Sequence, residues 1–120
     1  MAPKELIEKY FKAIHQGGWE SFVADDFTFS NGNLDNVVRG KAAYLEGAGR
    51  FFRTTTAVDV RQTLIQGPHV ATLARYSIRS PKGHTGVCDV AEFLTVVGDK
   101  LTASTIMFDT EALAKFMAQA

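Results

Sequence analysis

The chain has 120 residues, of which 46% are hydrophobic and 22% charged, values that fit one soluble globular domain and exclude a disordered or fibrous chain. Its 13 basic and 13 acidic residues cancel, so no net charge favours nucleic acid or an anionic membrane as a partner. The single cysteine, Cys88, excludes an intrachain disulfide, and no apolar run has the length of a signal-sequence core or a membrane span. We therefore expect one domain over residues 1–120, located in the cytoplasm.

Four segments have the composition of helices. Residues 4–16 repeat apolar side chains at helical spacing and end at a Gly-Gly pair. A short second helix is expected over residues 19–24, and a third over residues 41–53, where two glycines weaken the helical pattern. Asp109 or Thr110 can cap a last short helix, which we expect to end at Met117.

Five runs alternate apolar and polar side chains in the way of β-strands. They cover residues 27–31, 54–65, 70–79, 89–97 and 101–108, and residues 34–40 have loop composition. Tight turns join most of these runs, and short connections imply antiparallel neighbours. The sequence therefore predicts an α+β fold, with helices packed on one face of a bent antiparallel sheet.

Glu92 is the charged member of an otherwise apolar row in the strand predicted over residues 89–97. The alternation places four apolar side chains in its row: Cys88, Val90, Leu94 and Val96. An ionised carboxylate in such a row costs several kcal/mol, roughly, unless it is paired, hydrated or protonated. A sheet that curls around a helix can hold a small apolar ligand at its mouth, and Glu92, Asn31 and Tyr10 are the polar groups whose rows would point inward. There a carboxyl group can act as a general base or as a hydrogen-bond donor.

Each of these three residues also has a plainer explanation. Tyr10 fits as a core aromatic of the first helix, and Asn31 begins an Asn-Gly-Asn turn. Glu92 could be no more than an ion-pair partner for Arg75 or Arg79. With these explanations the domain would bind a ligand or dimerise without catalysing a reaction.

Motifs for other chemistry are missing from the sequence. The three histidines fall at a helix end and in two turns, without the spacing of a metal site: His15, His69 and His84. There is no glycine-rich phosphate loop, no Gly-x-Ser-x-Gly elbow and no plausible cysteine-histidine pair. We therefore expect neither a metal nor a cofactor.

Three short segments carry a family resemblance, by their order and spacing. They are Ala24-Asp25-Asp26-Phe27-Thr28-Phe29, Arg39-Gly40-Lys41-Ala42-Ala43 and Asp89-Val90-Ala91-Glu92. Over residues 6–108 the chain resembles the nuclear-transport-factor-2-like superfamily, in particular its SnoaL-like polyketide cyclase and ketosteroid isomerase branches. The resemblance implies a cystatin-like, cone-shaped antiparallel sheet that wraps around the N-terminal helices.

The resemblance also implies roles for the three polar residues. The isomerase branch's oxyanion-hole tyrosine corresponds to Tyr10, and its protonated acid corresponds to Glu92. The general-base aspartate of that branch falls on Asn31, and an amide cannot abstract a proton at neutral pH. A cyclase-like division of roles is therefore favoured, in which Glu92 transfers the proton, Tyr10 donates to the substrate oxygen and Asn31 orients the substrate.

The same resemblance implies a mostly apolar ligand site. Its expected ligand-binding residues are Trp19, Phe27, Phe29, Phe52, Ser104 and Phe108. Gly47 and Ala48 stand where the family has bulky aromatics on the third helix, so we expect a wide cavity on the helix side. The Arg-x-Asp of related epoxide hydrolases does not occur on the strands, and the histidines do not match those of scytalone dehydratase.

The predicted function is that of a cofactor-independent acid-base enzyme of the cyclase or isomerase type, acting on a small hydrophobic carbonyl compound. The alternative is a non-catalytic module of the same fold that binds a small ligand or dimerises. Members of the superfamily usually pair through the open face of the sheet, so we expect a homodimer. The residues suited to that face are Leu73, Val87, Ala91, Phe93 and Val97.

Overall fold

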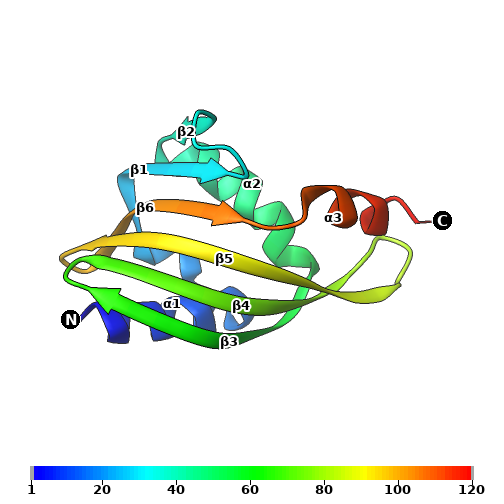
Figure 1. Cartoon of the computed structure of the whole chain (residues 1–120), viewed down its shortest axis with the longest axis horizontal. Coiled ribbons are helices and arrows are strands. Elements are labelled where there is room, and N and C mark those ends of the chain that lie inside the picture. The colour runs from blue at the N-terminus through cyan, green and yellow to red at the C-terminus, as the bar shows by residue number, and fades with distance from the viewer. Residues whose placement is uncertain (1, 120) are drawn as a thin grey trace.

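A computed structural model describes residues 2–119, which form three α-helices, a short 3-10 helix and six strands (Figure 1). In chain order these are α1 (Pro3–Gln16), η1 (Trp19–Phe22), β1 (Val23–Asn31), β2 (Val37–Arg39), α2 (Lys41–Thr54), β3 (Thr55–Gln66), β4 (His69–Arg79), β5 (Thr85–Val97), β6 (Lys100–Met107) and α3 (Thr110–Met117).

The six strands form one sheet in the order β2-β1-β6-β5-β4-β3. The strands from β3 to β6 are antiparallel neighbours joined by tight turns, as the sequence predicts. Strand β1 pairs with β6 in parallel, because the long path between them through α2 and four strands allows either direction. The α+β class with a curved sheet is confirmed, with this one parallel pair added to the antiparallel pattern.

Helices α1 and α2 lie against the same face of the sheet, behind it in the view of Figure 1. The apolar stripe of α1 is buried there and consists of Leu6, Ile7, Tyr10, Phe11 and Ile14. Helix α3 follows β6 and lies near the β4–β5 turn (Figure 1), where the ring of Phe116 packs on Gly86. A Cβ atom at residue 86 would lie 2.7 Å from that ring, so any larger residue would require the ring of Phe116 to shift. Asp109 caps α3 as predicted, because its carboxylate accepts from the Ala112 amide at 2.9 Å.

Two boundaries in the first half of the chain differ from the sequence prediction. The helix predicted over residues 19–24 is shorter, and β1 already begins at Val23. The acidic pair at residues 25–26 is exposed in an irregular part of β1, where the register to β6 shifts, so it does not end a helix. Residues 37–39, predicted as loop, form the edge strand β2, which is too short to show a periodic pattern.

The two faces of β5 differ as the alternation predicts. Glu92 lies in a buried row with its four apolar neighbours. Asp89 lies on the opposite, exposed row and accepts two hydrogen bonds from Arg75, at 2.7 and 2.9 Å. The idea that Glu92 pairs with Arg75 is therefore wrong, since Arg75 pairs across the strands with Asp89, and Arg79 lies on the same side of β4 as Arg75.

Candidate active site

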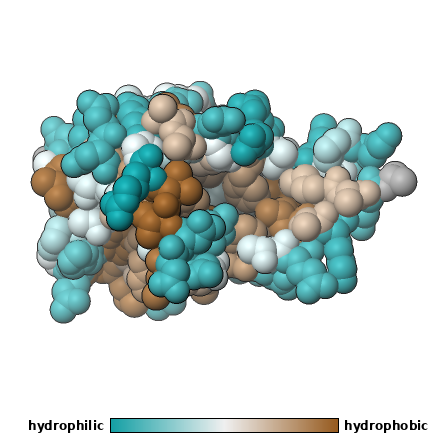
Figure 2. Space-filling view, turned by 90° about the horizontal axis from the view of Figure 1, so that it is seen from above, coloured by the Kyte–Doolittle hydropathy of each residue, from teal (hydrophilic) through white to brown (hydrophobic). Residues whose placement is uncertain are grey.

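A cavity of about 300 Å³ lies between α2, the covered face of the sheet and α3. Aromatic and aliphatic side chains make up most of its wall, and Asn31, Arg50 and Glu92 are among its polar members. Seen from above, hydrophobic atoms are exposed between polar side chains along the middle of the molecule toward α3 (Figure 2). Gly47 and Ala48 line the cavity on α2, and beyond its chain neighbours and the backbone of its own helix no atom lies within 4 Å of a Cβ built at residue 47. The helix wall of the cavity therefore carries small residues at these two positions.

Glu92 brings the only carboxyl group among the described residues that line this cavity. Its side chain is 5% exposed, and one carboxyl oxygen accepts a hydrogen bond of 2.6 Å from the Ser104 hydroxyl on β6. Burial raises the pKa of Glu92 to about 7, although the Ser104 hydrogen bond lowers it in part. Such a group is partly ionised at neutral pH, so it can both take up and release a proton.

All three tyrosines of the chain lie around this carboxyl group. Tyr10 from α1 and Tyr44 from α2 share a hydrogen bond of 2.8 Å between their hydroxyls, and Tyr76 comes from β4. Burial raises the pKa of each phenol, and the charge of Glu92 raises it further. The phenols therefore stay protonated and can act only as neutral hydrogen-bonding groups. Tyr44 and Tyr76 line the cavity, whereas Tyr10 does not.

The structure brings five of the nine residues predicted for the site to the cavity wall, which are Glu92, Asn31, Phe29, Phe52 and Phe108. A sixth, Ser104, supports the carboxyl group from the neighbouring strand. The other three lie outside the lining and pack against residues that form it.

These three residues support the wall through aromatic contacts and one hydrogen bond. Trp19 packs edge-on against Phe52, with ring centroids 4.7 Å apart. Phe27 lies 4.3 Å from the ring of Tyr44, to which Tyr10 is hydrogen-bonded. A direct contact of Tyr10, Trp19 or Phe27 with a ligand remains a prediction.

Sequence reasoning did not place Tyr44 and Tyr76 at this cavity. Tyr76 has the same signal as Glu92, because it is a polar-tipped residue in a mostly apolar row of its strand. Thr72 lies four positions before Tyr76 in the same row and pairs directly across from Glu92. Its hydroxyl is buried and has no hydrogen-bond partner among the described residues. Sequence reasoning therefore also missed Thr72, the β4 residue that is paired with Glu92.

Other kinds of site find no support within residues 2–119. No group of three histidine, cysteine or acidic side chains in that range is placed to hold a metal ion. None of the helices in that part of the chain combines the length and the apolar character needed to cross a membrane.

Residues 7–104 match the model of the family described as the SnoaL-like domain. No significant match occurs among curated proteins. Solved structures with the same fold include a protein from Jannaschia sp. CCS1 classed as a SnoaL-like polyketide cyclase, with 16% identity, a TM-score of 0.82, and coverage of 98% of this chain and 93% of that one.

Two further structures extend this likeness. TerC, crystallised with polyporic acid, has 19% identity and a TM-score of 0.81, over 98% of this chain and 100% of that one. The epoxide hydrolase/cyclase-like enzyme SalBIII, of pyran ring formation in the polyether salinomycin, has 15% identity and a TM-score of 0.79, over 91% and 92% of the two chains. At these identities the likeness shows the fold alone.

Proposed function

The chain belongs to the SnoaL-like family, and we propose that it is a cofactor-independent acid-base enzyme of the cyclase or isomerase type, acting on a small hydrophobic carbonyl compound. The observation that carries this proposal is Glu92, a buried carboxyl group in an apolar cavity whose pKa is raised to about 7. A general base is most effective when its pKa lies near the working pH. Similar folds named for cyclases support the reaction class without specifying the substrate.

In the proposed reaction, ionised Glu92 removes a proton from the carbon next to the substrate carbonyl. The electrons of the broken C–H bond move toward the carbonyl oxygen, and the phenols of Tyr44 and Tyr76 stabilise the resulting enolate by donating hydrogen bonds. Tyr10, hydrogen-bonded to Tyr44, holds that phenol in place and polarises it.

The second half of the reaction returns the proton and regenerates the carboxylate. In an isomerase, the substrate carries a β,γ double bond, so the intermediate is a dienolate and Glu92 protonates its γ-carbon. In a cyclase, the enolate carbon forms a bond to a second carbonyl carbon, and Glu92 protonates the alkoxide that results. Asn31, at the cavity wall, orients the substrate by hydrogen-bonding another of its oxygens.

Exchange of substrate protons for deuterium tests this chemistry without the natural substrate. We expect the protein to accelerate α-proton exchange of 2-tetralone in D₂O, followed by NMR, and Glu92→Gln to lower the enzymatic rate by about 10²- to 10⁴-fold. Asp89→Asn is the matched control, since it removes an exposed carboxylate from the other face of β5, and it should leave the rate unchanged.

Two results would refute the catalytic proposal. One is exchange by Glu92→Gln at the rate of the unmodified protein. The other is binding of 2-tetralone beside Glu92, seen in amide chemical shifts, without any acceleration of exchange. The second result would favour a non-catalytic ligand-binding module.

A further inference from the structure

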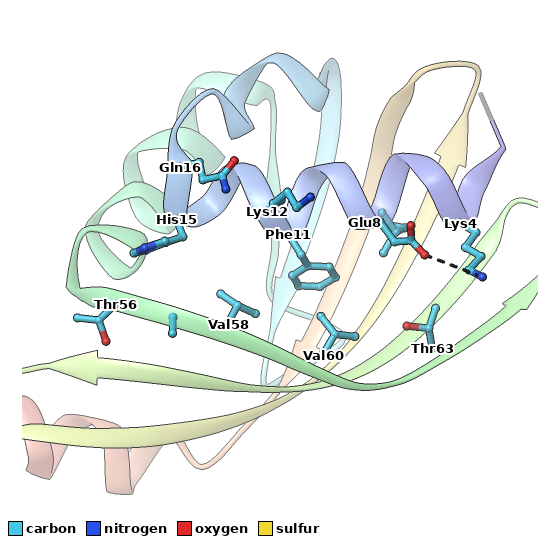
Figure 3. Close-up of a pocket in the computed structure, with 12 residues that line it drawn as sticks. Lys4, Glu8, Phe11, Lys12, His15, Gln16, Thr56, Val58, Val60 and Thr63 are labelled. Carbon is cyan, nitrogen blue, oxygen red and sulfur yellow. Dashed lines mark ion pairs between the residues drawn. The ribbon is translucent and has the colours of Figure 1, made fainter.

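A second cavity, of about 410 Å³, lies between α1 and β3 (Figure 3). It shares no lining residue with the cavity that contains Glu92. Its walls come from one helix and one edge strand of the sheet, so it has the form of a groove that follows α1. We call it the α1–β3 groove.

The middle of the α1–β3 groove is apolar. Phe11 of α1 faces Val58 and Val60 of β3 across it (Figure 3), and Ile7 adds to the helix wall. Phe11 and Ile7 are buried core residues, whereas Val60 is 36% exposed. Core side chains therefore form the helix wall of the groove, and a partly exposed valine lies on its strand wall.

An irregularity in β3 extends the strand wall of the groove. Thr56, Val58 and Val60 share one face by alternation, and Thr63 would point to the other face of a regular strand. The pairing with β4 shifts between Val60 and Gln62, and this bulge brings Thr63 back to the groove side. The same bulge makes β3 a poor edge for pairing with another strand, so we favour a small molecule over a peptide.

The charges on the helix wall are arranged unevenly along the groove. At one end, Lys4 and Glu8 form an exposed ion pair of 4.0 Å (Figure 3). Toward the other end, Lys12 lies beside Phe11 near the middle of the helix wall and His15 lies close to the end (Figure 3), and within residues 2–119 neither forms an ion pair. Because Lys4 and Glu8 offset each other, the helix wall carries a surplus of positive charge, which is located in the half that contains Lys12 and His15.

We propose that the α1–β3 groove binds a long-chain carboxylate, with the chain along Phe11, Val58 and Val60 and the carboxylate beside Lys12 and His15. From Lys4 to His15 the helix rises by about 16 Å, so a linear ligand fits better than a compact one. An apolar channel with positive charge toward one end is complementary to an amphiphile with one anionic end. This site is separate from the proposed acid-base site and does not depend on it.

Decanoate and decanol are suitable probes, since they share a chain and differ in charge. We expect decanoate to shift amide NMR signals of residues 7–16 and 56–63 rather than those around Glu92, and to bind two- to fivefold more tightly than decanol. Lys12→Met should weaken decanoate binding about two- to fivefold and leave decanol unchanged. Lys9→Met is the matched control, because Lys9 is paired with Glu5 and does not line the groove.

Val60→Ser tests the apolar part separately, at a site exposed enough for the variant to fold. It should weaken both probes severalfold. The proposal is overturned if neither probe binds at millimolar concentration, if the shifts cluster around Glu92, or if Val60→Ser changes nothing. Equal effects of Lys12→Met and Lys9→Met would also overturn it, because Lys12 would then only offset the helix dipole.

Discussion

Glu92 and Asp89 lie three residues apart on β5, and their carboxyl groups have opposite environments. Glu92 faces the covered side of the sheet, where burial raises its pKa to about 7. Asp89 faces the open side, where hydrogen bonds from Arg75 lower the pKa of the carboxyl group. One strand therefore presents a buried carboxyl group with a raised pKa on one face and an exposed carboxyl group, paired with Arg75, on the other. The environment of each carboxyl group follows from the face of the sheet on which it lies.

The largest difference between the two carboxyl groups is expected in the pH dependence of stability. The pKa of Glu92 is raised from 4.5 to about 7 on folding. The stability that the protonated carboxyl group contributes is therefore fully present below about pH 4.5 and is lost as the pH rises through 7. The loss is about 3 kcal/mol of unfolding free energy. Urea unfolding between pH 4.5 and 8 should show this decline, and Glu92→Gln should remove it.

Asp89 supplies the control for that measurement, with the opposite sign. Because its pKa is lowered on folding, Asp89 stabilises the fold above its unfolded pKa of 3.8. This stabilisation is lost only as the pH falls below that value. Asp89→Asn should therefore leave the slope between pH 4.5 and 8 as it is. A slope that persists in Glu92→Gln would mean that another group causes it.

The open face of β5 gives the next largest effect. Val87, Phe93 and Val97 are 55%, 58% and 61% exposed on it, so three large apolar side chains lie on one open row of the strand. We propose that this face pairs with a second copy of the chain. Phe93→Asp should weaken the dimer by about 2 kcal/mol or more, roughly 30-fold in dissociation constant, as measured by analytical ultracentrifugation.

A control variant shows whether the effect of Phe93→Asp on the dimer is specific to the open face. Leu34→Asp changes a residue that is 68% exposed and lies outside the paired strands, and it should leave the mass in solution unchanged. A monomeric unmodified protein at high micromolar concentration would contradict the dimer proposal.

A smaller effect is expected on the pKa of Glu92 when its hydrogen bond from Ser104 on β6 is removed. Ser104→Ala removes the 2.6 Å hydrogen bond that lowers the pKa of Glu92, so that pKa should rise further, by about one unit. Carbon-detected NMR titration of the carboxyl group measures it directly. Thr102→Ala, which removes a hydroxyl bonded to the Thr95 carbonyl instead, should leave the titration unchanged, and an equal shift in both variants would contradict the assignment.

The smallest effect should come from the tyrosine pair. Tyr10→Phe removes the hydroxyl that bonds Tyr44 but keeps the ring in the core. If Tyr10 acts through Tyr44, the variant loses about 1 kcal/mol of transition-state stabilisation. This loss corresponds to an exchange rate about fivefold lower. A fall comparable to that of Glu92→Gln would mean that Tyr10 contacts the substrate itself.

Periodicity and turn chemistry in the sequence were sufficient to predict the four long strands and the helices α1 and α2. They also predicted a cap at Asp109 or Thr110 and the buried row that contains Glu92. Each of these depends on local spacing, since a period of two or of 3.6 residues fixes which side chains share a face. The family resemblance supplied the curvature of the sheet and the class of the site. The short strand β2 and the early start of β1 escaped prediction because edge pairing and a bulge leave no regular pattern.

Contacts between distant segments were decided only in three dimensions. The parallel pairing of β1 with β6, the meeting of Tyr44 and Tyr76 around Glu92, and the groove between α1 and β3 all join parts of the chain that are far apart in sequence. Local spacing says that a side chain is buried, but which other side chains share its cavity depends on how the layers pack. For that reason the acid could be named from the sequence, whereas the tyrosines that surround it required the folded chain.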